Sequence, residues 1–247
     1  MSDAIPRLRM FAGPNGSGKT TVKNSLGKSE SWFGLYINPD DVEAVIRQTG
    51  LLPLEPLRMP VTVEAVRAYF ASSAFLAKAG FADAAHSIQL TGNSLDFRGL
   101  AFNSYHASVL SDFLRRRALE KGLTFSFETV MSAEDKVELL RDAQSRGYRT
   151  YLYFVATDNP DVNIQRVRTR VAAGGHDVPE DKIVARYHRS LELLKQAIPF
   201  TDRAFFFDTS DESAWYFAEI IDGDRVELQS DEIPSWFQPI WDSNPET

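Results

Sequence analysis

The sequence predicts an α/β fold in which a mostly parallel central sheet carries helices on both faces. Short apolar runs that suit buried strands alternate with longer amphipathic segments that suit helices. Glycines stand where many of the helical segments end. Such alternation is typical of βαβ units, whose right-handed crossovers build a three-layer arrangement. The 247 residues are enough for one such domain with a substantial core.

The composition is that of an ordinary globular chain. Its formal charge of −7 provides no basic field for nonspecific attraction of nucleic acid, so we expect no nucleic-acid partner. The absence of cysteine excludes disulfides and thiolate metal sites. No apolar run is long enough to span a bilayer, and residues 1–7 lack a signal-peptide pattern. We therefore expect a cytoplasmic chain without a membrane partner.

A glycine-rich loop follows the first predicted strand, residues 8–12. It fits the pattern G-x-x-x-x-G-K-[ST], the phosphate-binding P-loop, and a helix is predicted after it that ends at Gly27. In this setting backbone N–H groups surround phosphates, Lys19 adds positive charge, and Thr20 offers its hydroxyl to Mg²⁺. The alternative is a glycine-rich turn that binds nothing. The nucleotide-binding residues expected in this P-loop NTPase-type fold are Gly13, Asn15, Gly16, Ser17, Gly18, Lys19, Thr20 and Thr21.

Two aspartates follow the second predicted strand, residues 32–37. Asp40 and Asp41 come directly after Pro39, which would end the strand. They would then lie at the carboxyl edge of the sheet, where open α/β sheets bind ligands. One of them would alternatively serve as the N-cap of a helix over residues 42–47, and the two roles are compatible.

Residues 50–102 interrupt the alternation of strands and helices. Within this stretch, residues 50–60 are predicted to be a loop and residues 61–79 a helix that ends at Gly80. Residues 87–90 and 95–97 are either short strands or irregular, with a turn between them. We interpret residues 50–102 as a helical insertion, which either caps the site or only adds packing.

The remaining chain returns to a regular alternation and ends in a hairpin. The predicted helices cover residues 105–121, 133–146, 160–171 and 180–198. The predicted strands cover residues 123–127, 149–156 and 202–208, followed by a hairpin of 215–221 and 224–228. We expect residues 1–247 to form a single domain, with the C-terminal hairpin and tail in residues 212–247.

Several side chains are predicted to converge with the P-loop in a phosphoryl-transfer site. Glu128 follows a strand as Asp40 does, although a surface acid is the alternative. Arg166 and Arg170 share a helix face, which either closes over the phosphates or faces solvent. Arg168 should point away. His176, after a Gly-Gly pair, either contacts a phosphate or lies beside a helix cap formed by Asp177.

The ordered motifs resemble the zeta toxin family of P-loop kinases, and the chromosomal zeta-toxin-like proteins in particular. They read GPNGSGKTT, INPDD, FSFET, GGHDVPEDKIVARYHRSL and FFFDTS. The resemblance covers residues 8–48 and roughly 104–210. It implies a kinase that uses ATP or GTP with Mg²⁺ to phosphorylate the 3′-hydroxyl of UDP-N-acetylglucosamine, and that is held inactive by a small antitoxin protein.

The resemblance also implies roles for individual residues. Lys19 and Thr20 match the nucleotide-phosphate residues, Asp40 the catalytic base, and Arg166 the first phosphate-binding arginine, while the second falls near His176 or Arg170. The substrate-binding residues implied are Asp40, Asp112, Glu128, Thr129 and His176. The sequence Glu-Thr-Val-Met-Ser from Glu128 onward departs from the family's Glu-Gly-Thr-Gly-Arg, so the sugar specificity is not carried over. The alternative function is an ATP- or GTP-binding switch that acts through a protein partner.

Overall fold

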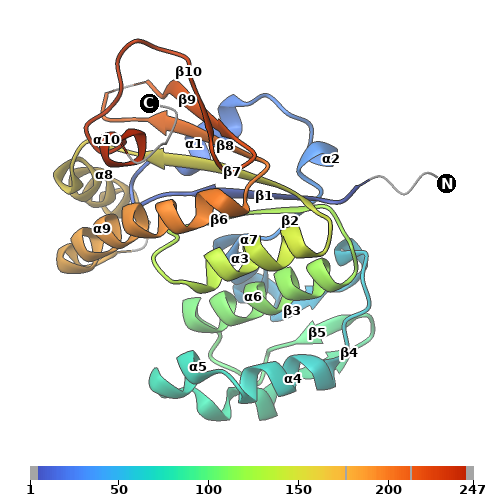
Figure 1. The fold of residues 1–247 in the computed structure, drawn as a ribbon. Coiled ribbons are helices and arrows are strands. Elements are labelled where there is room, and N and C mark those ends of the chain that lie inside the picture. The colour runs from blue at the N-terminus through green and yellow to red at the C-terminus, as the bar shows by residue number, and fades with distance from the viewer. Residues whose placement is uncertain (1–4, 176, 212, 243–247) are drawn as a thin grey trace. The chain divides into compact units, whose positions relative to one another are not determined.

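The computed structural model describes residues 5–175, 177–211 and 213–242. The chain divides into two compact units. The first unit consists of Met1–Phe33 and Ser126–Thr247, and the second of Gly34–Phe125. Figure 1 shows the P-loop helix α1 with the C-terminal strands in the first unit, and the green and cyan elements of the second.

A mostly parallel sheet forms the centre of the first unit. Its strand order within this unit is β10-β9-β8-β7-β1-β6. Strands β1, β7 and β8 pair in parallel, whereas β9 pairs antiparallel with both β8 and β10. The pair of β9 and β10 is the predicted hairpin. The strands are β1 (Arg7–Ala12), β6 (Phe125–Thr129), β7 (Arg149–Ala156), β8 (Arg203–Asp208), β9 (Trp215–Ile221) and β10 (Arg225–Leu228). The predicted fold class is therefore confirmed.

Helices cover both faces of this sheet. In Figure 1, α1 and α2 lie on one side of it and α7 and α9 on the other. Asn159 begins α8 as its N-cap, accepting hydrogen bonds from two backbone N–H groups, and Pro160 occupies the first turn as predicted. The helices are α1 (Lys19–Ser25), α2 (Glu30–Phe33), α7 (Asp135–Ser145), α8 (Pro160–Ala172), α9 (Glu180–Ala197), η3 (Ile198–Phe200) and α10 (Gln238–Trp241).

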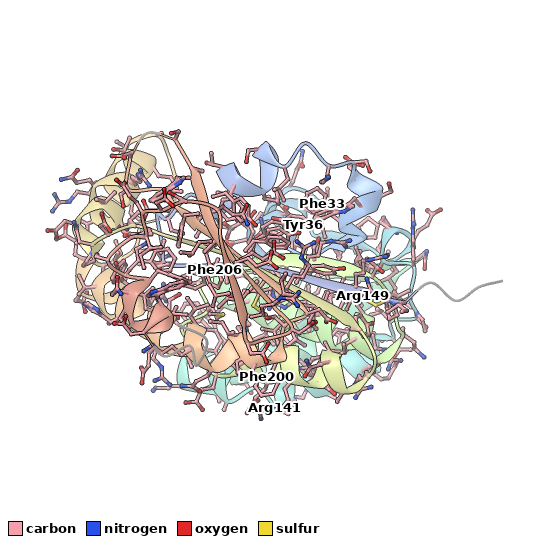
Figure 2. The ribbon with its side chains drawn as sticks, turned by 45° about the horizontal axis from the view of Figure 1, so that its top comes forward. Phe33, Tyr36, Arg141, Arg149, Phe200 and Phe206 are labelled. Carbon is pink, nitrogen blue, oxygen red and sulfur yellow. The ribbon has the colours of Figure 1, made fainter. Side chains whose placement is uncertain are left out.

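Aromatic side chains fill the space between the sheet and its helices. On one face, Tyr153 of β7 stacks between Phe11 and Phe205 of the neighbouring strands, with ring centroids 4.7 and 4.8 Å apart. On the other face, Phe206 is fully buried against Phe237. At the rim, the Arg141 guanidinium lies 4.7 Å from the centre of the Phe200 ring, which ties α7 to η3 (Figure 2). These contacts make the sheet a rigid base for the loops at its edge.

The predicted strand over residues 32–37 is mostly wrong. Trp32 and Phe33 end the helical turn α2, and only Leu35–Tyr36 forms strand β2. Gly34 separates them with a φ of 67°, a conformation that ends regular structure, and a Cβ there would lie 2.2 Å from the Thr124 carbonyl oxygen. The aromatic run was misleading because Trp32 covers the buried Arg9 guanidinium, 3.9 Å from the ring centre, instead of extending a strand.

The second unit combines helices with a small antiparallel sheet of order β3-β5-β4. Strand β3 corrects the prediction of a loop over residues 50–60, because Leu52 pairs with Leu95. The predicted helix over residues 61–79 breaks at Ser73, whose side chain caps a new helix by accepting from the Leu76 N–H. The elements are β2, α3 (Pro39–Thr49), β3 (Leu51–Pro53), η1 (Glu55–Leu57), α4 (Val63–Ala71), α5 (Ala74–Lys78), η2 (Ala82–Ser87), β4 (Gln89–Thr91), β5 (Ser94–Asp96) and α6 (Ser104–Glu120).

The longest helix of the described chain is the 18-residue α9. It is amphipathic, with charged side chains along its outer face and Tyr187 and Leu194 among its buried residues. Throughout the three described ranges, no helix is both long and apolar enough to cross a membrane.

Candidate active site

The P-loop follows β1 and leads directly into α1, as the sequence predicts. Gly13, Gly16 and Gly18 all have positive φ, at 145°, 75° and 80°. Packing imposes a second requirement on two of them. A Cβ on Gly13 would lie 2.0 Å from the Val155 carbonyl oxygen, and one on Gly16 would lie 2.7 Å from that of Asn163. The glycines therefore allow both the backbone conformation and the close approach of the loop to β7 and α8.

The polar side chains of the loop form a donor set that fits a polyphosphate. The Lys19 ammonium group donates to the carbonyl oxygens of Gly13 at 2.9 Å and Pro14 at 2.8 Å, so it lies against the loop. The buried Ser17 hydroxyl has no hydrogen-bond partner within the described chain. The exposed Thr20 hydroxyl lies in the first turn of α1, and Thr21 beside it is also exposed. Cationic and hydroxyl donors around backbone N–H groups are suited to binding phosphate oxygens.

Glu128 lies beside the P-loop at the end of β6. Its Oε2 accepts a 2.7 Å hydrogen bond from the Thr20 hydroxyl, and its Oε1 lies 3.7 Å from the Lys23 ammonium group. The neighbouring Thr129 carbonyl accepts from the Gly13 N–H at 3.3 Å. The Thr129 hydroxyl accepts from the Met131 N–H at 3.1 Å, which orders the turn after the strand. The structure therefore brings together Glu128, Thr129 and the P-loop, as expected from their positions at strand ends.

Thr209, directly after β8, supports the P-loop from the opposite side. Its hydroxyl donates to the Ser17 carbonyl oxygen at 2.8 Å. The Arg166 guanidinium holds this segment by donating to the carbonyl oxygens of Thr209 at 2.5 Å and Asp211 at 3.0 Å. An open hollow of about 560 Å³ lies beside these contacts, and its lining residues are Val162, Gln165, Arg166, Ser210, Asp211 and Ser213. Arg166 thus lies close to the P-loop, but its guanidinium group donates hydrogen bonds to backbone carbonyl oxygens.

The other arginines of α8 have different surroundings. Arg168 forms an ion pair with Glu180 at the start of α9, at 2.5 Å, so it points away from Arg166 as predicted. Arg170 is exposed, and its carbonyl oxygen accepts from the Gly175 N–H at the helix end. His176 lies outside the described residues.

Asp40 belongs to the second unit, where it is exposed in the first turn of α3. The Asn38 side chain accepts from the Asp40 N–H at 3.2 Å and is the N-cap of α3. This corrects the expectation that Asp40 or Asp41 caps the helix. Pro39 fixes the first helical position, which moves the cap one residue before it.

Asp112, also in the second unit, is held by its neighbours on two helices. It accepts a short hydrogen bond from the Tyr69 hydroxyl and a 3.0 Å bond from the Arg116 Nε, and Arg115 lies 3.7 Å away. Burial, followed by the hydrogen bond to Asp112, raises the pKa of Tyr69 to about 12, so the hydroxyl keeps its proton and remains a donor. These contacts hold the Asp112 carboxylate in place within its unit, and its role in substrate binding stays a prediction.

Two residues of the site were not identified from the sequence. The amide of the fully buried Asn163 donates to the Asn15 carbonyl oxygen at 2.6 Å and accepts from the Thr157 hydroxyl. Arg186 of α9 donates to the Asn15 side-chain oxygen at 3.4 Å. No periodic signal marks these residues, although Arg186 lies within the motif GGHDVPEDKIVARYHRSL.

Comparisons with known proteins concern the family and the fold. Residues 102–217 match the family model described as zeta toxin. An uncharacterised protein of Haemophilus influenzae is 26% identical over 70 residues, which are 28% of this chain and 50% of that protein.

Two solved structures share the fold. One is the AvrRxo1-ORF1:-ORF2 complex with ATP, with a TM-score of 0.56 and 13% identity over 99% of this chain and 65% of that chain. The other is the same pair with sulphate ions, with a TM-score of 0.55, 13% identity and coverage of 99% and 66%. The chain thus spans half of the curated relative and less than two thirds of these solved chains. Residues 102–217 of this chain are thus similar to the zeta toxin family, and its P-loop lies at the sheet edge.

Proposed function

We propose that the chain transfers the γ-phosphate of ATP, in the presence of Mg²⁺, to a hydroxyl group of a small acceptor. UDP-N-acetylglucosamine is the first candidate acceptor, because the sequence motifs resemble those of zeta toxins. The observation that carries the proposal is the cluster of Lys19, Thr20 and Glu128, with Thr20 and Glu128 2.7 Å apart. It provides a cation, a hydroxyl and a carboxylate around one loop, which suits a magnesium-bound nucleotide.

The residues present fit the cation as well as the phosphates. Hydroxyl and carboxylate oxygens are the ligands that Mg²⁺ prefers, and Thr20 and Glu128 offer one of each. A bound Mg²⁺ would neutralise charge on the β- and γ-phosphates. Lys19 would then leave the carbonyl oxygens of Gly13 and Pro14 for the phosphate oxygens, which are stronger acceptors for an ammonium group.

The chemical step requires a group that accepts the proton of the acceptor hydroxyl. In the step, the acceptor oxygen bonds to the γ-phosphorus, the bond from that phosphorus to the β–γ bridging oxygen breaks, and the nucleoside diphosphate leaves with that electron pair. The hydroxyl proton passes to a carboxylate. We assign this role to Asp40 from its motif, and its exposure leaves it accessible to an acceptor.

A protein partner is part of the proposal. The resemblance to zeta toxins implies a small antitoxin, and AvrRxo1-ORF1 was solved together with a second protein, ORF2, in the presence of ATP. We propose that this chain also has an inhibitory partner and acts in the cytoplasm. A small protein that co-purifies with this chain and abolishes its ATP binding would support this part of the proposal.

A direct assay measures transfer of labelled γ-phosphate to a panel of nucleotide sugars. We expect Lys19→Ala to lower the rate about 10²-fold or more, because it removes a positive charge from the transition state. Asp40→Asn should do the same, whereas Asp41→Asn, a matched change in the same exposed helical turn, should not. If label appears only as inorganic phosphate with every acceptor, the chain is an NTPase or a switch. Equal rates for Asp40→Asn and the parent would refute the assignment of the base.

A further inference from the structure

Arg186 on α9 is a cation beside the P-loop that has no acidic partner among the residues that the structure describes. It is half-buried, and within the described ranges its side chain makes one hydrogen bond, of 3.4 Å to the Asn15 side-chain oxygen. Over the described residues it forms no ion pair, in contrast to Arg168 with Glu180 and Arg189 with Glu134. A guanidinium group that has only one long bond to a neutral amide retains most of its donors for a ligand.

The fold fixes the position of Arg186 firmly. The adjacent Tyr187 is buried, and its hydroxyl donates to the Thr157 carbonyl oxygen at 2.6 Å. One turn further, the Ser190 hydroxyl donates to the Val130 carbonyl oxygen at 2.9 Å. Thr157 follows β7 and Val130 follows β6, the two strands that flank β1 in the sheet. Helix α9 is therefore anchored across the ends of both neighbours of the strand that leads into the P-loop.

Arg166, the arginine that the resemblance to zeta toxins favours, already donates hydrogen bonds within the protein. The Arg166 guanidinium bonds to the carbonyl oxygens of Thr209 and Asp211, and these bonds hold the segment that supports the P-loop. Binding phosphate through Arg166 would require those bonds to break. Arg186 would lose only its long contact with Asn15, and a charge-assisted, forked bond to phosphate oxygens would replace it.

We propose that Arg186 binds the terminal phosphate of the nucleotide on the P-loop and stabilises its charge during transfer. This inference rests on the proposed function. It assigns the second phosphate-binding cation to α9, whereas the sequence motifs suggested Arg170 or His176. Because α9 is anchored through Tyr187 and Ser190, this cation is in place before an acceptor binds.

The test compares Arg186→Gln with Arg189→Gln, a matched change three residues along the same helix. Among the described residues, the ion pairs of Arg189 are with Glu134 and Glu192 on the outer surface, so its loss should leave nucleotide binding unchanged. Calorimetric titration of ATP and of ADP, each with Mg²⁺, reports the contact to the terminal phosphate. We expect Arg186→Gln to weaken ATP binding about 10-fold or more while leaving ADP binding within about twofold. The rate of transfer at saturating ATP should fall about 10²-fold or more.

Several outcomes would overturn the inference. Equal weakening of ATP and ADP would show that Arg186 only supports the loop through Asn15. Unchanged ATP affinity with unchanged transfer would remove it from the site, while leaving the proposed function intact. Wild-type protein that binds no ATP would overturn both. A thermal midpoint for Arg186→Gln equal to that of Arg189→Gln ensures that a loss of ATP affinity reflects the contact and not unfolding.

Discussion

Asn163 connects the P-loop to the rest of the fold, and an isosteric change tests this role. Its amide donates to the Asn15 carbonyl oxygen at 2.6 Å and accepts from Thr157, and the side chain is fully buried. Asn163→Asp keeps the shape but replaces the donor with a carboxylate oxygen. That oxygen would face the Asn15 carbonyl, so an attractive contact becomes a repulsive one inside the protein.

The loss in the free energy of unfolding depends on which hydrogen-bond partners remain after Asn163 is replaced. In Asn163→Ala, the Thr157 hydroxyl can still donate to the Asn159 carbonyl oxygen at 3.1 Å, so the main loss is the bond to Asn15 plus a small cavity. We expect a cost of about 2 kcal/mol in the free energy of unfolding. Asn163→Asp adds a buried, unpaired charge, and its cost should exceed that of the alanine variant, reaching about 3 kcal/mol or more at neutral pH.

Urea unfolding followed by circular dichroism measures these free energies. Asn159→Asp is the matched control, since aspartate caps a helix as well as asparagine does, and Asn159 is the N-cap of α8. The destabilisation in Asn163→Asp should shrink as the pH falls, because the protonated carboxyl group can again donate to Asn15. An aspartate variant as stable as the parent, or more stable than the alanine variant at neutral pH, would refute the reasoning.

Two further predictions concern ionisable groups. Glu128→Gln keeps a hydrogen-bond acceptor for the Thr20 hydroxyl but removes the negative charge, so we expect the Mg²⁺ concentration needed for nucleotide binding to rise about 10-fold. If instead the KM for the phosphoryl acceptor rises and the Mg²⁺ dependence is unchanged, Glu128 contacts that substrate, as the resemblance to zeta toxins implies. Burial lowers the pKa of His106, whose Nδ1 accepts from the Asn103 N–H, so the unfolded chain binds the proton more readily and stability should fall as the pH drops below about 6.5. In His106→Gln, which preserves the capping box, urea midpoints measured between pH 8 and 5 should lose this component, and an unaltered profile would contradict it.

The sequence predicted correctly those elements that depend on neighbouring residues in the chain. The P-loop was recognisable because its glycines meet conformational demands at fixed spacing, and Glu128 because it ends an alternating strand. The hairpin around Asp222 was predicted from its turn residues for the same reason. By contrast, the break at Ser73 depends on a side-chain cap that competes with a continuous helical pattern, so the prediction of one helix failed there.

The contacts that complete the site are far apart in the sequence. Asn163 and Arg186 meet Asn15 across 148 and 171 residues, and Thr209 meets Ser17 across 192. A single sequence carries no periodic signal for such pairs. Arg166 was identified as a functional candidate from the helix face it shares with Arg170 and from the resemblance to zeta toxins, but its bonds to backbone carbonyls could be seen only in the folded chain.

The Thr209 contact with Ser17 has a consequence for synthesis on the ribosome. The P-loop is synthesised well before its supports at Asn163, Arg186 and Thr209. Contacts across such spans form late, because closing a long chain segment precedes any gain from the contact. A nascent chain that ends before Thr209 would lack the hydrogen bond from this residue to the Ser17 carbonyl oxygen. The P-loop would therefore have its full set of supports only after the chain up to Thr209 has been synthesised.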